Sequence, residues 1–522
     1  MLNAGQFLIS RRPLEKPDFI RIKLTDGYYL HYHKKLPVYI HPSFQVLLLG
    51  TAWQAKAGCE DPIEGIERLV ETYPEDIPEQ AVLSMEEGWC GRYVLIVQER
   101  VYLDATGLLG VFYSKEGISS SCLLLAECME LPEKFFRTSS GLNWLPGPLT
   151  QYAQIRRLLP SQIYNYGKHS LGERKLLAAQ IPECVGEEDR IREFVASFAY
   201  SLKNMARIFP NKKFMIALTG GYDSRTLLAL ADYAGIPFEC FTLGYEDIPA
   251  GDVEIPEELC RMVKCGYTYI PREKVRYSEQ LEREYTLHTA GLADDGDKQH
   301  YAYGQYQELV RKFGEVVLLR GSVWEVAIEY IEKVIGDKLE PESIYDHYKI
   351  GPEGLERDSL KEYFKWAQKN EQTGVSAANR FFWEQRYGSW LSSIEQSFDM
   401  MDGVISLHPV NSRFLITQLL GFPKEERIVR AHQLNIISYI RPELANVRFS
   451  GNRPANRSYW FLLEEKIKQG ADRLHRLGLK KTARIYKNLV KTYIKKERLK
   501  KENKRNFKKG FKERPQNENI DG

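Results

Sequence analysis

Long hydrophobic runs, a signal sequence and paired cysteines are all missing from this chain of 522 residues. No apolar stretch approaches the ~20 residues that a membrane-spanning helix requires. Residues 1–17 contain two arginines but no apolar segment ahead of a cleavage site, which a secretory signal would have. We therefore expect a cytoplasmic protein without a transmembrane segment.

The cysteines form no Cys-x-x-Cys pair. Their scatter over a long chain predicts reduced thiols instead of a disulfide framework or a zinc site. Cys260 and Cys265 are close enough in sequence to be paired, but core or surface thiols are the favoured interpretation. The eight cysteines are Cys59, Cys90, Cys122, Cys128, Cys184, Cys240, Cys260 and Cys265.

The whole chain has no large excess of one charge, because its net charge is +3. Its C-terminal part, in contrast, is strongly basic. Residues 480–514 contain 16 Lys or Arg and 3 acidic residues, and residues 515–522 carry −2, which leaves −8 for residues 1–479. Residues 460–500 have the periodicity of a positively charged helix, and beyond Lys500 the apolar positions fade, which predicts a solvated, disordered segment. An anionic partner for the tail is the alternative. Nucleic acid is disfavoured, because no aromatic-basic motif accompanies the charge.

The centre of the chain carries an apolar run, two glycines and a helix-forming segment. Residues 214–218 predict a short buried strand, and residues 226–234 a helix that Gly235 ends as a C-cap. A strand, a glycine turn and a helix N-terminus direct backbone N–H groups at an anion. Glycines at Gly220 and Gly221 let that backbone approach a phosphate closely.

The segment Thr-Gly-Gly-Tyr-Asp-Ser at 219–224 resembles the pyrophosphate loop, Ser-Gly-Gly-x-Asp-Ser, of the N-type ATP pyrophosphatases. The Gly-Lys-Ser/Thr ending of a Walker loop is absent. An ordinary strand-to-helix turn is the alternative. In the resemblance, Asp223 holds Mg²⁺ or braces the loop. The other residues that it implies at the phosphates of ATP are Leu218, Thr219, Gly220, Gly221 and Ser224.

Residues 1–50 and 80–125 alternate apolar and polar groups in short runs, which predicts a β-rich layer with helices packed on it. Residues 91–127 resemble the end of the glutaminase domain of asparagine synthetases, an Ntn-hydrolase fold. Residues 149–160 resemble the stretch that joins that domain to the synthetase domain. The matching positions in the first segment are Asp104, Gly107, Tyr113, Ser121 and Glu127.

The nucleophile of that glutaminase is an N-terminal cysteine that acts with its own amine as base. Position 2 of this chain is Leu2, and the first cysteine is Cys59. The arginine and Asn-Gly signatures that hold glutamine are not recognisable either. We therefore expect no glutaminase activity, as in the β-lactam synthetases and lasso-peptide cyclases, which keep the domain as a structural lobe.

Two later segments resemble further parts of the synthetase domain. Residues 238–244 predict a parallel strand, whose end at Leu243 lies beside adenine in the resemblance. Asp252 begins a segment that resembles the Asp-Glu-x-x-x-Ala helix of the family. The alternative is that Asp252 is an ordinary helix cap. Residues 315–325 predict a strand and a glycine turn like the family signature Leu-Ser-Gly-x-Gly-x-Asp-Glu, in which Gly321 matches the first glycine.

This second signature is incomplete. Glu325 matches the family Glu, and Tyr330 stands five residues later and would face the substrate. The family Asp that helps hold Mg²⁺ is missing, and Trp324 is inserted beside its place. Either Glu325 replaces that Asp as a catalytic and metal-binding carboxylate, since carboxylate oxygens suit Mg²⁺, or the metal site is weakened.

Residues 340–395 predict helices, and residues 397–411 resemble a family loop that contacts substrate or the first domain. In this loop His408 is a base or, as we favour, a hydrogen-bonded structural residue. Arg427, Arg430 and Arg441 lie where relatives place a lysine that neutralises pyrophosphate, and the sequence does not choose among them.

These resemblances predict an α/β protein with a degenerate glutaminase-like domain at 1–185 and a doubly wound PP-loop ATP pyrophosphatase domain at 186–475. The charge and periodicity of residues 476–522 add a basic C-terminal helix and tail. They imply an AMP-forming ligase that uses ATP and Mg²⁺ to adenylate a small-molecule or peptide carboxylate, which ammonia or an amine then attacks. A silent nucleotide-binding scaffold and a tRNA-modifying PP-loop enzyme are the alternatives.

Overall fold

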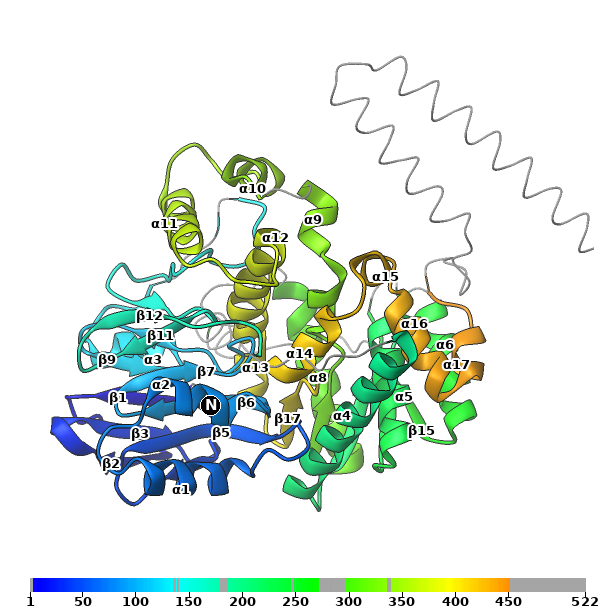
Figure 1. Ribbon diagram of the computed structural model, residues 1–522, viewed down its shortest axis with the longest axis horizontal. Coiled ribbons are helices and arrows are strands. Elements are labelled where there is room, and N and C mark those ends of the chain that lie inside the picture. Colours follow the sequence, from blue (N-terminus) through cyan, green and yellow to red (C-terminus); the bar gives the residue numbers. More distant parts are fainter. Residues whose placement is uncertain are drawn as a thin grey trace, which may run out of the picture. The chain divides into compact units, whose positions relative to one another are not determined.

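The computed structural model describes residues 3–134, 138, 140–178, 186–245, 248, 250–271, 283, 296–335 and 339–450. Three sheets organise them (Figure 1). Leu2, Cys184, the expected boundaries near 185 and 475, and the basic tail lie outside the described residues, so the predictions made for them stay predictions. Among the described residues, no helix combines the length and apolar character of a membrane crossing.

Two six-stranded antiparallel sheets form the N-terminal part of the fold. The alternating runs at 1–50 and 80–125 predict most of their strands, but β10, β11 and β12 lie beyond those runs and were not predicted. In sheet order, the first contains β10 (Arg156–Arg157), β8 (Phe112–Tyr113), β9 (Gly117–Ser119), β1 (Phe7–Ser10), β3 (Tyr29–His33) and β2 (Phe19–Lys23). The second contains β12 (Ser170–Glu173), β11 (Gln162–Asn165), β7 (Arg100–Leu103), β6 (Trp89–Val97), β5 (Val46–Gln54) and β4 (Val38–Ile40). The 3-10 turn η1 (Thr25–Gly27) links β2 to β3.

Apolar side chains occupy both faces of these sheets. Phe7 and Ile9 of β1 share one core with Leu47 and Leu49 of β5, so the two sheets face each other. Residues of the opposite parity on β5 and β6 pack in a separate core with α1 (Pro62–Thr72) and α2 (Glu79–Glu86). The outer face of the first sheet packs on α3 (Cys122–Cys128). The result is an α-β-β-α layering.

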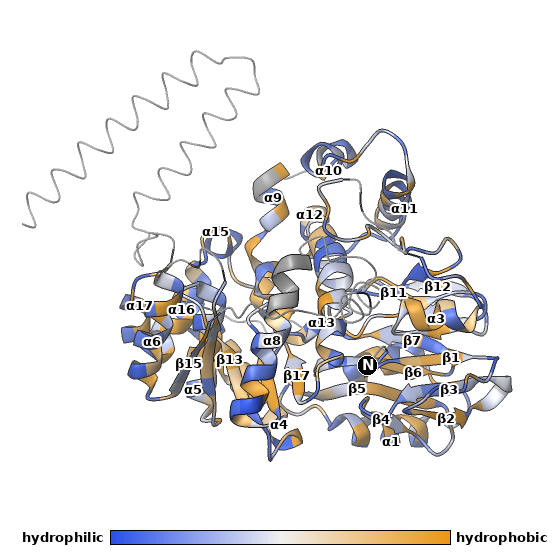
Figure 2. Cartoon of the chain, turned by 180° about the vertical axis from the view of Figure 1, so that it is seen from behind, coloured by the Kyte–Doolittle hydropathy of each residue, from blue (hydrophilic) through white to orange (hydrophobic). Residues whose placement is uncertain are grey.

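A five-stranded parallel sheet forms the second part of the fold, with strand order β15 (Gly266–Ile270), β14 (Glu239–Leu243), β13 (Lys213–Ala217), β16 (Val316–Leu319) and β17 (Val404–Leu407). The order runs outward from β13 in both directions, which is doubly wound topology. Figure 2 shows β13 in the orange of hydrophobic residues, as expected for a strand covered on both faces.

The strand period assigns the helices to two faces of this sheet. Phe214 and Ile216 point into a core with α4 (Glu187–Ile208), α5 (Tyr222–Ala234) and α6 (Gly251–Val263), whereas Met215 points into a core with α8 (Gly296–Phe313) and α13 (Ser392–Asp399). Gly235 ends α5 with φ +68°, the left-handed C-cap that the sequence predicts.

The remaining helices follow β16 and β17. They are η3 (Trp324–Ile328), α9 (Tyr330–Ile335), α10 (Pro341–His347), α11 (Leu355–Lys369), α12 (Ala377–Phe381), η4 (Phe382–Leu391), α14 (Arg413–Leu420), α15 (Lys424–Ile428), α16 (Ala431–Ile440) and α17 (Pro442–Asn446). η4 is a ten-residue π-helix that continues α12 into α13. Wide helical turns of this kind are rare and concentrate at functional sites.

The end of α13 and the segment that follows it join the two parts of the fold. Arg92 of β6 donates to both oxygens of Asp399 at 2.6 and 2.7 Å. The amide of Asn411 donates to the carbonyl of Gly91 at 2.6 Å and to Asp104 Oδ1 at 2.9 Å. Residues 397–411 thus contact the N-terminal sheets, one of the two roles expected for them. The expected loop also contains β17, a strand that the sequence did not predict.

Candidate functional site

The turn after β13 is held by its own side chains. Thr219 N–H donates to Ser224 Oγ at 3.1 Å, and the two hydroxyl oxygens lie 3.2 Å apart. Gly221 N–H donates to Thr219 Oγ1 at 3.3 Å, and Gly220 N–H donates to Asp252 Oδ1 at 3.0 Å. Asp252 therefore braces the turn from the first turn of α6 and does not serve as that helix's cap.

The two glycines of this turn have different surroundings. A Cβ on Gly220 would lie 2.7 Å from Ser450 Cβ and 2.9 Å from the carbonyl oxygen of Gly251, so Gly220 is required by packing. Within the described part of the chain, a Cβ on Gly221 would meet only Thr219 Oγ1, at 3.4 Å. The space above Gly221, at the N-cap of α5, is open to an anion at the positive end of the helix dipole.

The turn after β16 lies against the turn after β13. The two strands are neighbours, and a Cβ on Gly321 would lie 3.1 Å from the backbone nitrogen of Ser224. β13 and β16 flank the point at which the strand order changes direction, and ligands of open α/β sheets bind outside the carboxyl ends of such strands. The two glycine turns singled out in the sequence therefore meet at the switch point.

Asp223 on the first turn of α5 faces two donors from the C-terminal helices. Arg430 Nη1 lies 2.5 Å from Asp223 Oδ1, and Gln433 Nε2 donates to the same oxygen at 2.8 Å. Within the described residues both donors bind Oδ1, which leaves Oδ2 for another partner. The guanidinium of Arg430 also lies 5.7 Å from the ring centre of Tyr222. Arg430 thus brings positive charge to the mouth of the glycine turn.

Glu325 on η3 completes a pair of carboxylates with Asp223. Burial raises the pKa of Glu325, and the negative charge of Asp223 raises it further, whereas Arg386 and Arg430 act in the opposite direction. Tyr387 Oη donates to Glu325 Oε2 at 3.3 Å. Two carboxylates and two guanidinium groups from four separate elements therefore share one electrostatic neighbourhood, which suits a metal-bound polyphosphate.

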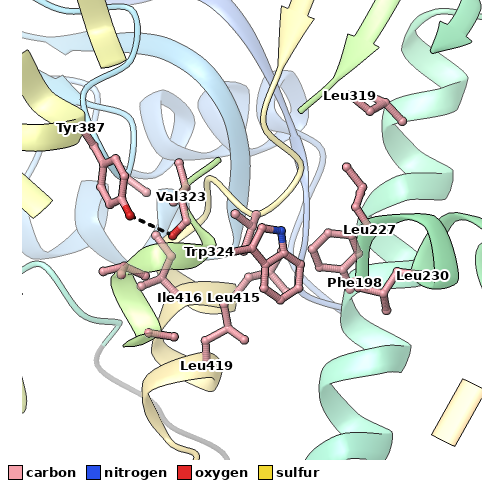
Figure 3. Packing of buried hydrophobic residues seen from close by; sticks show 14 of the residues in the cluster. Phe198, Leu227, Leu230, Leu319, Val323, Trp324, Tyr387, Leu415, Ile416 and Leu419 are labelled. Atoms are coloured by element: carbon pink, nitrogen blue, oxygen red, sulfur yellow. Dashed lines mark hydrogen bonds between the residues drawn. The ribbon is translucent and has the colours of Figure 1, made fainter. Parts of the chain in front are cut away.

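Trp324 explains how Glu325 is positioned. Relative to the family signature at 315–325, Trp324 is an insertion. Its buried indole packs between Phe198 of α4 and the side chains of α14 (Figure 3). Its ring centre lies 5.6 Å from that of Phe198. Tyr387 Oη also reaches the carbonyl of Val323, at 3.4 Å, as the dashed line in Figure 3 shows. The packed indole and this bond fix the backbone on which Glu325 is carried.

Arg225 is a structural residue that the sequence analysis did not single out. Its buried guanidinium donates to the carbonyls of Val447 and Arg448, each at 2.7 Å, and to that of Gly220 at 3.3 Å. It also lies 3.7 Å from the ring centre of Phe449, which stacks on Tyr222 with ring centres 4.0 Å apart. The segment after α17 is thereby fastened against the glycine turn.

The three arginines left open by the sequence have separate environments. Arg427 is buried and ion-paired with Glu329 at 2.9 Å. Arg441 is paired with Asp232, at the far end of α5, at 2.6 Å. Only Arg430 among these three contacts a residue of the glycine turn. Arg430 is therefore the candidate for the cation that neutralises a leaving phosphate.

The remaining predicted positions are distributed around this centre. Leu218 is buried, and its backbone binds Phe241 and Thr242 of β14, while Leu243 is half-buried at the end of that strand. Tyr330 is 46% exposed and packs on Phe382 with ring centres 5.5 Å apart.

His408 lies away from the glycine turn, at the end of β17. It is fully buried, and its Nε2 lies 2.9 Å from Glu395 Oε1. Arg320 also pairs with Glu395. Burial opposes ionisation of Glu395, but these two partners hold its pKa well below its usual range. His408 is thus enclosed in the packed interior beside a carboxylate that Arg320 also binds, away from the glycine turn.

Comparison with known proteins finds solved structures with low similarity to this chain. No family model matches the chain, and no curated protein matches it. A glutamine-dependent NAD+ synthetase from Acinetobacter baumannii solved with ADP is similar at TM-score 0.21 and 11% identity, covering 44% of this chain and 41% of that chain. An NMN synthetase from Francisella tularensis has TM-score 0.20 and 13% identity, covering 52% and 100%.

A U34-tRNA thiolase from Methanococcus maripaludis with a [4Fe-4S] cluster has TM-score 0.24 and 11% identity, covering 61% of this chain and 89% of that chain. The chain thus spans less than half the length of the Acinetobacter synthetase. With TM-scores this low, none of these structures assigns a family or a function to the chain.

Proposed function

We propose that this protein is an ATP-dependent ligase of the asparagine-synthase-like kind, which forms AMP and pyrophosphate while activating a carboxylate for attack by ammonia or an amine. The observation that carries the proposal is the meeting of two glycine turns at the switch point of a doubly wound sheet, with Asp223 of the first turn bound by Arg430 and Glu325 following the second turn.

The residues present suit ATP with Mg²⁺. Asp223 and Glu325 would hold the cation, because carboxylate oxygens are the ligands that Mg²⁺ prefers, and bound Mg²⁺ would neutralise charge on the departing pyrophosphate. Thr219, Gly221 and Ser224 offer amides and hydroxyls for the phosphates. Within the turn, the N–H groups of Thr219 and Gly221 now donate to uncharged hydroxyl oxygens. Charged phosphate oxygens are stronger acceptors and can replace these hydroxyls.

The arginines supply the remaining charge of the proposed reaction. Arg430 lies at the turn and would bind the pyrophosphate, while its bond to Asp223 holds it in place before the nucleotide enters. Arg386 of the π-helix, whose guanidinium lies 3.4 Å from the ring centre of Trp390, would face the carboxylate to be activated. A preorganised cation at each end of the reacting group stabilises the charges that develop during adenylation.

The N-terminal part is proposed to be a degenerate, Ntn-type glutaminase lobe. Its α-β-β-α layering supports this assignment. A thiol nucleophile must ionise to act. Burial raises the pKa of every described cysteine in these layers, which are Cys59, Cys90, Cys122 and Cys128. Ammonia or the amine would then reach the ligase from solution.

The proposal is tested by calorimetric titration of ATP into the full-length protein, with and without Mg²⁺, followed by product analysis with pools of carboxylates and amines. We expect Mg²⁺-dependent binding of ATP. With a carboxylate that is a substrate, we expect release of AMP and pyrophosphate. Release of ADP and phosphate would contradict the adenylation step. Absence of ATP binding would replace the proposal with a silent scaffold of the same fold.

A further inference from the structure

A cluster of three cysteines lies outside the proposed nucleotide site. The sulfur atoms of Cys240, Cys260 and Cys265 all lie within 4.8 Å of one another, and those of Cys240 and Cys265 are 3.8 Å apart. Cys240 and Cys260 are buried, whereas Cys265 is half-buried. We propose that these thiols form a binding site for a thiophilic d¹⁰ divalent cation of the zinc type.

The local fold brings the three thiols together for identifiable reasons. Lys264 ends α6 in the left-handed conformation with φ +59°, and Cys265 N–H then donates to the carbonyl of Cys260 at 3.1 Å. This C-cap reverses the chain direction and brings Cys265 next to Cys260. Cys240 belongs to β14, the neighbour of the strand that Cys265 precedes. Strand β14, helix α6 and the short link between α6 and β15 thus each contribute one sulfur.

The spacing of the sulfur atoms fits one ion. Thiolates that bind zinc tetrahedrally at ~2.3 Å have sulfur atoms ~3.8 Å apart, which is the separation of Cys240 and Cys265. A disulfide requires a far shorter separation of ~2.05 Å. An iron–sulfur cluster places its thiolates on different iron atoms and would hold them farther apart than this trio. The geometry therefore favours a single ion over a disulfide or a cluster.

A route to the trio and a fourth coordination position are also present. Cys265 lines a surface cavity of about 580 Å³ that extends past Gly235 and Lys264. The carboxylates lining this cavity have other partners, since Asp232 is paired with Arg441 and Glu239 with Lys213. Water from the cavity would therefore be the fourth ligand, as three protein ligands plus water are a common zinc arrangement.

The trio is separate from the nucleotide site but shares α6 with it. Cys240 pairs with Ile216, three residues before Thr219, which corresponds to a distance of ~10 Å along the strand direction. The opposite end of α6 carries Asp252, which braces Gly220. A cation bound by the trio would fasten the last turn of α6 to β14 and to the chain before β15, and would stabilise the sheet without taking part in the proposed reaction.

The test uses full-length protein, reduced and stripped of metal, and titrated with Cd²⁺ as a spectroscopic probe and with Zn²⁺ against a chromophoric chelator. We expect one equivalent of either ion, sulfur-to-cadmium charge-transfer absorption and a higher melting temperature with Zn²⁺. Cys265→Ser, at a half-buried position, should lose the bound equivalent and the absorption. Cys59→Ser, also half-buried but in the N-terminal layers, should keep both.

The proposal is overturned by reduced wild-type protein that binds neither ion. It is also overturned by unchanged stoichiometry and absorption in Cys265→Ser. A mass two daltons lower in protein handled without oxidant, with peptides linking Cys240 to Cys265, would identify a disulfide instead. ATP binding by Cys265→Ser should equal that of wild type, so a failure of the nucleotide site and a failure of the cysteine site give different results.

Discussion

The paired glycines of the turn at 219–224 allow a test in which two adjacent, chemically identical substitutions have opposite effects. Gly220→Ala places a methyl 2.7 Å from Ser450 Cβ and 2.9 Å from the carbonyl oxygen of Gly251. The carbonyl belongs to the backbone and cannot rotate away. The substitution also displaces the hydrogen bond from Gly220 N–H to Asp252. Overpacking and the lost bond together should cost about 2–4 kcal/mol of folding stability.

Gly221→Ala should leave the fold intact. Its methyl would meet only Thr219 Oγ1 at 3.4 Å, and the φ of −83° at Gly221 is open to any residue. Because alanine also restricts the unfolded chain, folding stability should stay level or rise by roughly 0.4–1 kcal/mol. The methyl does, however, occupy the space in which a phosphate oxygen would approach the amides of the turn. ATP affinity should fall at least about tenfold, which is ~1.4 kcal/mol.

The assay combines thermal unfolding, without nucleotide, with calorimetric titration of ATP well below the melting temperature. Gly235→Ala is the matched control, because Gly235 has φ +68° and lies at the other end of α5. That variant should melt earlier, through strain in the left-handed conformation, but bind ATP as wild type does. ATP binding by Gly221→Ala that equals wild type would refute a phosphate site at this turn. Wild-type melting of Gly220→Ala would refute the packing argument.

Three further predictions concern the charged groups and the N-terminal part. Glu325→Gln should abolish the Mg²⁺ dependence of ATP binding. It should also raise the melting temperature of nucleotide-free protein at neutral pH, and this gain should shrink as pH falls, because a raised folded-state pKa makes ionisation of Glu325 unfavourable in the native state. Arg430→Met should weaken ATP binding without a large loss of stability, whereas Arg427→Met should cost about 3–5 kcal/mol by leaving Glu329 buried and unpaired. Glutamine supplied to the purified protein should yield no glutamate above background in a coupled assay, and enzyme-like release would contradict the degenerate lobe.

The sequence predicted the local units of the fold well where one pattern dominated. Strand β13, the glycine turn and helix α5 follow from an apolar run, two glycines and a row of helix formers, and Gly235 ends the helix as expected. Strands β15 and β17 were missed. β15 carries glycine and two tyrosines and is partly exposed at the sheet edge, and β17 is only four residues long, so neither shows a clear strand period.

The sequence suggested some residues of the candidate site and not others, and their roles stay predictions. Asp223 and Glu325 were both chosen from their places in two motifs, and the fold brings them into one electrostatic neighbourhood. Arg386 and Tyr387 were not chosen, because their role depends on a π-helix that begins at Phe382, and no local sequence rule indicates that wider turn. Arg225 was also missed, since its partners are backbone carbonyls of the segment after α17, more than 200 residues away.

The sequence by itself determined the local units with a clear pattern, such as β13 and α5, because periodicity, glycine and helix caps act over a few residues. It also placed one acidic side chain after each of two strands. Only the tertiary structure decided that β13 and β16 are neighbours, which puts Asp223 beside Glu325, and that Cys240 meets Cys260 and Cys265. Strand order and helix packing are set by burial of apolar faces across the whole chain, and a local pattern does not encode which distant face will be its partner.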